Sequence, residues 1–175
     1  MSTVTVGQSY KNMPEFLDLI AFSEGTALSS RSVSAILSRD DGYDVIVAGV
    51  NGPEIFTDYS DHPFVHRRAK LIRASTTTAD ALFSTASGRY QILCRYFETY
   101  KAQLNLFNFS PISQDIVAIQ QIRERGAVPH IINGDIPTAI KLCSNIWASL
   151  PGNNYQQGGH TLEALVNQFN QSVVS

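Results

Sequence analysis

The sequence has few of the residues that build metal centres or disulfide frameworks. Cys94 and Cys143 are the only two cysteines among 175 residues, and they lie far apart in the chain. Neither belongs to a Cys-x-x-Cys pair or to a Cys and His spacing typical of zinc sites. The histidines, which also lack metal-ligand spacing, are His62, His66, His130 and His160. We therefore expect two buried thiols, no metal site and no cofactor.

An excess of charge of either sign is missing as well. Thirteen Lys and Arg residues stand against fifteen Asp and Glu residues, which gives a net charge of −2 and an isoelectric point of about 6.0. A general binder of DNA or RNA carries a basic surface, because it neutralises phosphates. We therefore expect no nucleic-acid partner.

Long apolar runs are the third absence. No 18-residue apolar stretch occurs, and residues 1–13 lack the basic region followed by an apolar region that marks a secretory signal. We expect a cytosolic product that does not insert into a membrane. If its substrate lies outside the inner membrane, another component must let the protein through. The hydrophobic content of 43% suits one domain with a buried core.

What is present begins with an apolar stretch at residues 14–26 that ends in a carboxylate. Phe16, Leu19 and Ile20 have helical spacing, and Gly25 directly after Glu24 predicts the end of that helix. The negative end of the helix dipole and the apolar neighbours of Glu24 both disfavour its ionised form. A carboxyl group that stays protonated near neutral pH is suited to general acid catalysis. A solvated glutamate at a helix end is the alternative.

After residue 26 the spacing of the apolar residues changes from helical to alternating. Residues 27–41 are rich in serine and predict a loop with at most one helical turn, followed by β-type residues at 43–49. Gly52-Pro53 predicts a turn, and residues 55–59 resume strand composition, so we expect a hairpin. Residues 60–87 show no clear period and indicate either a functional flap or disorder. Within them, the basic run at 66–70 predicts a solvated surface.

The remainder of the chain has helical periodicity and recognisable helix caps. Ser110-Pro111 and Asp135 precede two of the predicted helices, which cover residues 89–104, 112–125, 136 to the Pro151-Gly152 pair, and 161–173. Trp147 lies on an apolar stripe and is expected in the core. The residues predicted to face inward on the last helix are Leu162, Leu165, Val166 and Phe169.

Together these elements predict an α+β, lysozyme-like fold with a cleft between two lobes. The mainly helical lobe would comprise residues 13–25 and 88–175, and a small antiparallel β-sheet or hairpin at about 42–62 would face it. Residues 1–175 would then form a single catalytic domain.

Six blocks of sequence resemble one known family. They are AFSEGT (21–26), GYDVIVAG (42–49), FTDYSDHP (56–63), GRYQIL (88–93), FSPISQDIVAIQQIRERGAVP (109–129) and CSNIWASLPG (143–152). Taken in order over most of the chain, they are similar to the endolysins of lambda-type bacteriophages, which are peptidoglycan lytic transglycosylases with a lysozyme-like fold. Residues 27–41 and 63–87 depart from the family's usual connections, which leaves contacts with the sugars open.

The resemblance implies that Glu24 is the catalytic acid of host cell lysis. It would protonate the β-1,4 bond between N-acetylmuramic acid (MurNAc) and N-acetylglucosamine (GlcNAc), and the muramyl C6 hydroxyl would then attack its own ring to give 1,6-anhydro-MurNAc. The protein would be made in the host cytoplasm and act in the periplasm once a holin has permeabilised the membrane. The holin is needed functionally without direct contact, and we expect a monomer.

Five further residues are candidates for substrate binding. Tyr43 and Tyr59 offer rings for stacking on sugars, and Asp44 offers a carboxylate for sugar hydroxyls. By resemblance, Gln91 contacts substrate or Glu24, or else it packs as the N-terminal residue of a helix. Arg89 binds a muramyl lactyl carboxylate, or else it pairs with a nearby acid.

Two alternative functions stay open at this point. A hydrolytic muramidase would cut the same bond with Asp44 or Asp58, both expected on strands, positioning a water. A cell-wall-binding phage protein would have kept the fold and lost the chemistry, although the intact SEGT block argues against it.

Overall fold

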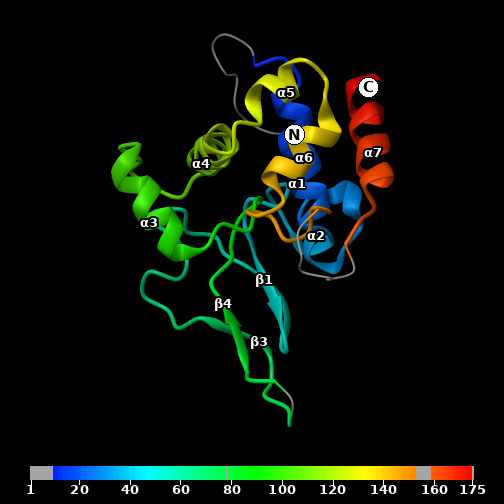
Figure 1. Ribbon diagram of the computed structural model, residues 1–175. Coiled ribbons are helices and arrows are strands. Elements are labelled where there is room, and N and C mark those ends of the chain that lie inside the picture. Colours follow the sequence, from blue (N-terminus) through cyan, green and yellow to red (C-terminus); the bar gives the residue numbers. More distant parts are fainter. Residues whose placement is uncertain (1–9, 78, 153–158, 175) are drawn as a thin grey trace. The chain divides into compact units, whose positions relative to one another are not determined.

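The computed structural model of the protein describes residues 10–77, 79–152 and 159–174 (Figure 1). The polar, aperiodic composition of residues 1–12 predicts a frayed N-terminal arm, of which only residues 10–12 lie within these ranges. The chain forms two compact units, which we call the helical unit (residues 1–24 and 115–175) and the mixed unit (residues 25–114). One boundary between them follows Glu24, and the other lies within a helix. The predicted single catalytic domain, its lobes and its cleft stay predictions.

The helical unit is built around the first helix. Its elements are α1 (Met13–Ser23), the greater part of α4 (Pro111–Glu124), α5 (Val128–Ile132), α6 (Ile136–Cys143) and α7 (Leu162–Val174). Helix α1 packs against α5 and α7, and α6 packs against both α5 and α7. Fully buried apolar residues at helical spacing, such as Phe16 and Ile20 in α1 and Ala139 and Ile140 in α6, form the core.

Local signals set the ends of these helices. The Asp135 side chain accepts a hydrogen bond from the Thr138 N–H at 3.4 Å and caps α6, as the sequence predicted. Helix α5 was not predicted, and α6 ends at Cys143, well before Pro151. Trp147 is buried, as expected. The inward position predicted for Leu162 is wrong: 42% of it is exposed, since it lies in the first turn of α7, before the buried pair Leu165 and Phe169.

The mixed unit contains two separate two-stranded antiparallel sheets. The first joins β1 (Val45–Gly49) to β2 (Gly52–Ile55) with Val45 opposite Ile55, which confirms the predicted hairpin. The turn lies two positions earlier than expected, at residues 50 and 51, because Gly52 already pairs with Gly49 and adopts φ +83°. Residues 56–59 therefore follow the strand and are not part of it.

The second sheet corrects the prediction of an aperiodic segment at residues 60–87. Strands β3 (Lys70–Arg73) and β4 (Leu82–Ser84) pair there with Leu71 opposite Phe83. They have only four and three residues, too few for an alternating pattern to be recognised. Long-range contacts support them, since the Leu71 carbonyl accepts a hydrogen bond from the Val50 N–H at 3.1 Å. The Lys70 ammonium donates to the Gly52 carbonyl at 2.9 Å.

The basic run at 66–70 is exposed over its first three residues and also forms ion pairs. His66, Arg67 and Arg68 are exposed, as expected. Arg67 in addition forms two hydrogen bonds of 2.6 and 2.8 Å with the Glu54 carboxylate on β2. Lys70 lies 3.3 Å from the same carboxylate.

Two segments of the mixed unit have different helical content from the prediction. Residues 27–41 form a 3-10 helix, η1 (Leu28–Ser30), and a short helix, α2 (Val33–Leu37), which Ser32 caps by accepting a hydrogen bond from the Ala35 N–H at 3.0 Å. Helix α3 (Cys94–Gln103) begins five residues later than predicted. With helices and two antiparallel sheets, the predicted α+β class is confirmed.

Candidate active site

Glu24 is the residue at which α1 ends. It caps the helix with φ −74°, and Gly25 follows with φ +71°, a conformation that most residues avoid and that turns the chain away from the helix axis. The neighbouring residues Leu17, Ile20 and Ala21 are almost completely buried. The first helix therefore holds a carboxyl group at the edge of an apolar core, as the sequence predicted.

Burial changes the chemistry of this carboxyl group. Glu24 is half-buried, and loss of water around it raises its pKa from 4.5 to about 7. A hydrogen bond from the Ser149 hydroxyl to Glu24 Oε1, 2.5 Å long, opposes this shift by favouring the ionised form. Near neutral pH the group exists in both forms, so that it is able to give up a proton and to take one back.

Ser149 is a site residue that the sequence reasoning missed. It lies in the CSNIWASLPG block, after α6, between the buried residues Trp147 and Leu150. The Leu150 N–H donates to the Trp147 carbonyl at 3.0 Å, which holds this turn in place. The only signal in the sequence was the position of Ser149 within one of the blocks that carry the family resemblance.

The GRYQ segment forms a turn and not the start of a helix. Ser87 and Ile92 flank it and exchange two backbone hydrogen bonds of 3.1 and 2.9 Å, and Gln91 within the turn adopts φ +48°. Gln91 therefore does not pack as the N-terminal residue of a helix. It is half-buried, and its side-chain amide donates to the Gly88 carbonyl at 2.9 Å.

Arg89 is buried in the turn and held by partners within the mixed unit. Its guanidinium lies 2.8 Å from the Asp41 carboxylate and stacks 5.3 Å from the centre of the Tyr43 ring. Its backbone N–H donates to Gln114 Oε1 at 2.9 Å, and its carbonyl accepts from the Thr26 hydroxyl at 2.5 Å. Only 1% of Arg89 is exposed. Of its two predicted roles, the ion pair with a nearby acid is the one observed.

Gln114 is a second residue that sequence reasoning missed. Its side-chain amide is fully buried and also donates to the carbonyls of Tyr43 and Phe109, at 3.0 Å each. A Cβ atom on Gly88 would lie 2.1 Å from Gln114 Oε1, so the turn requires glycine at that position. Gln114 therefore fixes the backbone of the GRYQ turn.

Two of the residues expected to bind sugar are buried instead. Tyr43 is 1% exposed and packs edge-on against Tyr90, with ring centres 6.2 Å apart, so neither ring face is open to a ligand. Asp44 is 4% exposed and accepts hydrogen bonds from the Ser38 hydroxyl and, at 2.9 Å, from the Arg39 N–H. The roles predicted for these side chains do not fit this burial.

Tyr59 and Asp58 remain closer to the surface. Tyr59 is half-buried, and its hydroxyl donates to Asp40 Oδ2 at 2.6 Å. Burial and this hydrogen bond raise the pKa of Tyr59, which keeps the phenol neutral. Asp58 is exposed in a loop, where it accepts from the Ser60 N–H at 2.8 Å. Neither Asp44 nor Asp58 lies on a strand, contrary to the prediction.

The remaining findings concern the cysteines, possible metal ligands and membrane-spanning helices. Cys94 and Cys143 are buried, as predicted, and both are free thiols; burial raises the pKa of the Cys143 thiol to about 12. Within residues 10–77, 79–152 and 159–174, no group of three or more His, Cys, Asp or Glu residues is arranged to hold a metal ion. No helix in these same ranges has the length and apolar character needed to cross a membrane.

Comparisons with known proteins agree with one another. The family model for endolysins matches residues 14–174. The chain is 52% identical over 160 residues to the endolysin of Escherichia phage P2, which covers 90% of each chain. It is 49% identical over 157 residues to the endolysin of Escherichia phage lambda, which covers 90% of this chain and 88% of the relative.

The solved structures give the same result. Bacteriophage lambda lysozyme in complex with a chitohexasaccharide matches with a TM-score of 0.78 at 46% identity, covering 97% of each chain. A second structure of lysozyme from bacteriophage lambda matches with a TM-score of 0.74 at 46% identity, covering 96% of this chain and 97% of the other. The predicted lysozyme-like fold is thus confirmed. This chain belongs to the phage endolysins, enzymes that cleave the peptidoglycan of the bacterial cell wall.

Proposed function

We propose that the protein is a lytic transglycosylase that cuts the β-1,4 bond between MurNAc and GlcNAc with Glu24 as its catalytic residue. The observation that carries this proposal is the Glu24 carboxyl group, which has a pKa of about 7 and a hydrogen bond to Ser149. The similar lambda lysozyme was solved with a chitohexasaccharide, which supports a glycan strand as the ligand here.

The proposed reaction uses one carboxyl group twice. Protonated Glu24 gives its proton to the glycosidic oxygen, and the bond from that oxygen to the muramyl anomeric carbon breaks. The C6 hydroxyl of the same ring then forms a bond to this carbon and loses its proton to the ionised Glu24. The products are a free GlcNAc hydroxyl and a 1,6-anhydromuramyl end, and no water is consumed. Because the nucleophile is already tethered to its target, no second carboxylate is required.

Ser149 would support the ionised stage of this cycle. Between the two proton transfers Glu24 is a carboxylate, and the Ser149 hydroxyl then donates a charge-assisted hydrogen bond to it. The surroundings of Glu24 favour the protonated form, and Ser149 limits the cost of losing the proton.

Hydrolysis of the same bond is the second candidate function. The name lysozyme carried by the similar lambda structures favours it. A muramidase of the usual kind needs a second carboxylate to activate water or to act as nucleophile. Both oxygens of Asp44 accept hydrogen bonds from Ser38 and Arg39, and Asp58 lies exposed in a loop. These positions support transglycosylation over hydrolysis. The third function, a cell-wall-binding protein without activity, is disfavoured by the raised pKa of Glu24.

The remaining roles are assigned according to burial. We propose that Gln91 and Tyr59, which are half-buried, contact the sugars, whereas Tyr43, Asp44 and Arg89 position the backbone around them. The whole chain would act as a monomeric catalytic domain. It would be made in the host cytoplasm and reach the periplasm after a holin opens the membrane.

The test combines a variant with analysis of the products. Glu24→Gln should keep the fold and sugar binding but lose lysis of permeabilised Gram-negative cells by at least about a thousandfold, because the amide has no acidic proton to transfer. Glu163→Gln, an exposed glutamate on α7, is the matched control and should lyse normally. Mass spectrometry of murein digested by the unaltered protein should show anhydro ends, each one water lighter than reducing ends. Only reducing ends, or full lysis by Glu24→Gln, would contradict the proposal.

A further inference from the structure

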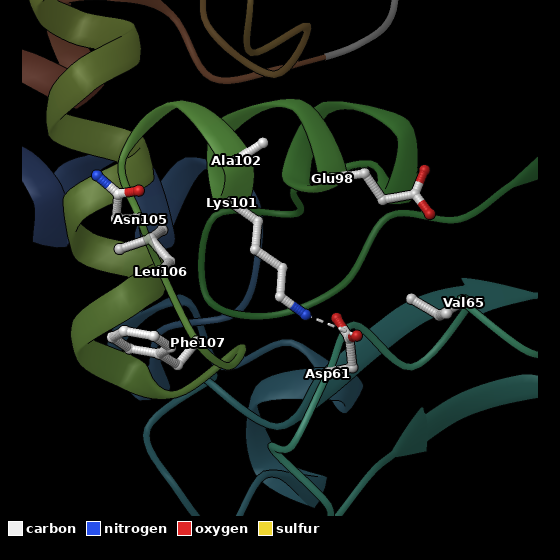
Figure 2. Close-up of a pocket in the computed structure, with 8 residues that line it drawn as sticks. All are labelled: Asp61, Val65, Glu98, Lys101, Ala102, Asn105, Leu106 and Phe107. Carbon is white, nitrogen blue, oxygen red and sulfur yellow. Dashed lines mark hydrogen bonds and ion pairs between the residues drawn. The ribbon is translucent and has the colours of Figure 1, made fainter.

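The mixed unit contains a pocket of about 500 Å³ beside α3 (Figure 2). We call it the α3 pocket. Its lining includes Glu98 and Lys101 on α3, Asp61 and Val65 on the loop after β2, and Leu106 and Phe107 directly after the helix. None of these residues belongs to the acid site at Glu24 or to the sugar contacts proposed above.

The pocket contains charges of both signs. Figure 2 shows Lys101 extending from α3 toward Asp61, and the ammonium lies 2.7 Å from Asp61 Oδ2. Burial would raise the pKa of Asp61, but the hydrogen bonds from Lys101 and from the His62 N–H outweigh it and lower that pKa. Among the described residues, no hydrogen bond or ion pair engages the Glu98 side chain. The pocket therefore contains an ion pair, formed by Lys101 and Asp61, together with the exposed carboxylate of Glu98.

An exposed aromatic ring completes the pocket. Phe107 is 89% exposed, far more than any other large apolar residue among those described. Its position is fixed by the end of α3, where Asn105 adopts φ +52° and the Leu106 N–H donates to the Lys101 carbonyl at 2.9 Å. The ring thus lines the same pocket as the Lys101 and Asp61 pair and is left largely uncovered by the protein.

Size and chemistry together indicate the class of ligand. A volume of 500 Å³ lies in the range of pockets for small ligands and is too small for a folded partner. A neutral sugar has no charge to match Glu98 and Lys101, whereas a short peptide with an amino group and a carboxylate does. Peptidoglycan contains such a component, the stem peptide attached to each MurNAc residue.

We propose that the α3 pocket binds the stem peptide of peptidoglycan. A free ammonium of the peptide would pair with Glu98, a carboxylate would approach Lys101, and an alanine methyl group would pack on Phe107. The endolysin would then hold its polymer through the peptide as well as through the glycan strand. This inference rests on the proposed function, since it assumes that peptidoglycan is the substrate.

A titration of the full chain with the free tripeptide L-alanyl-γ-D-glutamyl-meso-diaminopimelate tests the inference. The backbone amide signals of Glu98, Lys101 and residues 105–107 should shift and saturate in NMR spectra of the labelled protein. Glu98→Gln and Phe107→Ala should each weaken binding by at least about fivefold, because each removes one of the three contacts. Both side chains are exposed, so the fold should persist.

Matched controls separate the pocket from the general surface. Glu163→Gln on α7 and Phe83→Ala on β4 remove an exposed glutamate and an exposed phenylalanine elsewhere, and both should bind the tripeptide normally. No shift at residues 105–107 up to millimolar peptide, or equal weakening by the control variants, would overturn the inference.

A second measurement separates this inference from the proposed function. Phe107→Ala should cleave intact murein more slowly than the unaltered protein, yet cleave peptide-free glycan strands at the same rate. Equal rates of both proteins on intact murein would refute the peptide site and leave the role of Glu24 standing. Cleavage of the peptide-free strands by Glu24→Gln would instead refute the proposed function.

Discussion

Glu24 and Arg89 are both ionisable residues in blocks that resemble the endolysin family, yet the partners that surround their side chains differ. Arg89 has a carboxylate, an aromatic ring and two backbone hydrogen bonds around it, so its charge is matched within the mixed unit. Among the described residues, the Glu24 carboxyl group accepts one hydrogen bond, from Ser149, and its surroundings raise its pKa to about 7.

The difference separates a structural charge from a reactive one. A buried charge with matched partners has little reason to change its protonation state, and it stabilises one conformation of the chain. Burial can raise the pKa of a carboxyl group to near neutral pH, because it makes the ionised form less stable. Such a group is therefore able to exchange a proton near neutral pH. Substitution should accordingly cost stability at Arg89 and activity at Glu24.

The largest expected effect on stability is at Arg89. Arg89→Met should lower the free energy of unfolding by about 3 kcal/mol, because it removes a buried guanidinium together with its ion pair to Asp41 and its stacking on the Tyr43 ring. Urea unfolding followed by circular dichroism measures this change. Arg95→Met, at an exposed arginine on α3, should change stability by less than about 0.5 kcal/mol. If Arg89→Met and Arg95→Met changed stability by similar amounts, Arg89 would not be the structural charge that we contrast with Glu24.

The next largest effect is expected at Glu24, where substitution should raise the free energy of unfolding by an amount that depends on pH. The folded protein holds the pKa of Glu24 at about 7, above the ordinary value of 4.5. The stability that this group contributes is therefore complete below pH 4.5 and is lost as the pH rises through 7. Glu24→Gln lacks this dependence, so at pH 8 it should be more stable than the unaltered protein, by on the order of 2 kcal/mol after allowance for partial exposure.

Unfolding curves between pH 4 and pH 8 measure this dependence. The gap in stability between Glu24→Gln and the unaltered protein should widen across that interval, while Glu163→Gln should follow the unaltered protein. A constant gap would mean that the ionised form of Glu24 costs the fold nothing.

The smallest effect concerns the hydrogen bond between Ser149 and Glu24. Ser149→Ala removes an interaction that lowers the pKa of Glu24, so this pKa should rise and the alkaline limb of the kcat/KM profile should move to higher pH. kcat should fall by about fivefold, since the ionised carboxylate loses a charge-assisted hydrogen bond. Ser29→Ala, at an exposed serine, is the control. An unchanged pH profile would show that Ser149 does not influence the pKa of Glu24.

What the sequence predicted well depends on neighbours close in the chain. The apolar face and the end of α1, the Asp135 cap of α6 and the buried Trp147 all follow from residues within a few positions of one another. The same holds for the raised pKa of Glu24, which follows from its place at a helix end beside apolar residues.

What the sequence did not predict depends on distant partners. Strand β3 is held by a hydrogen bond from Val50, and the GRYQ turn by Gln114, 25 residues from Arg89. The bond between Ser149 and Glu24 joins positions 125 residues apart. A single sequence does not show which distant residues meet. Consequently Tyr43 and Asp44 were assigned to the sugar, although their partners lie within the protein.

The most direct test of this account is an NMR titration of the Glu24 side-chain carboxyl carbon, identified by its absence from the spectrum of Glu24→Gln. The account predicts a midpoint near pH 7, because burial at the end of α1 outweighs the hydrogen bond from Ser149. A midpoint near 4.5, the ordinary value for a glutamate, would show that Glu24 is ionised at neutral pH and has no proton to give to the glycosidic oxygen.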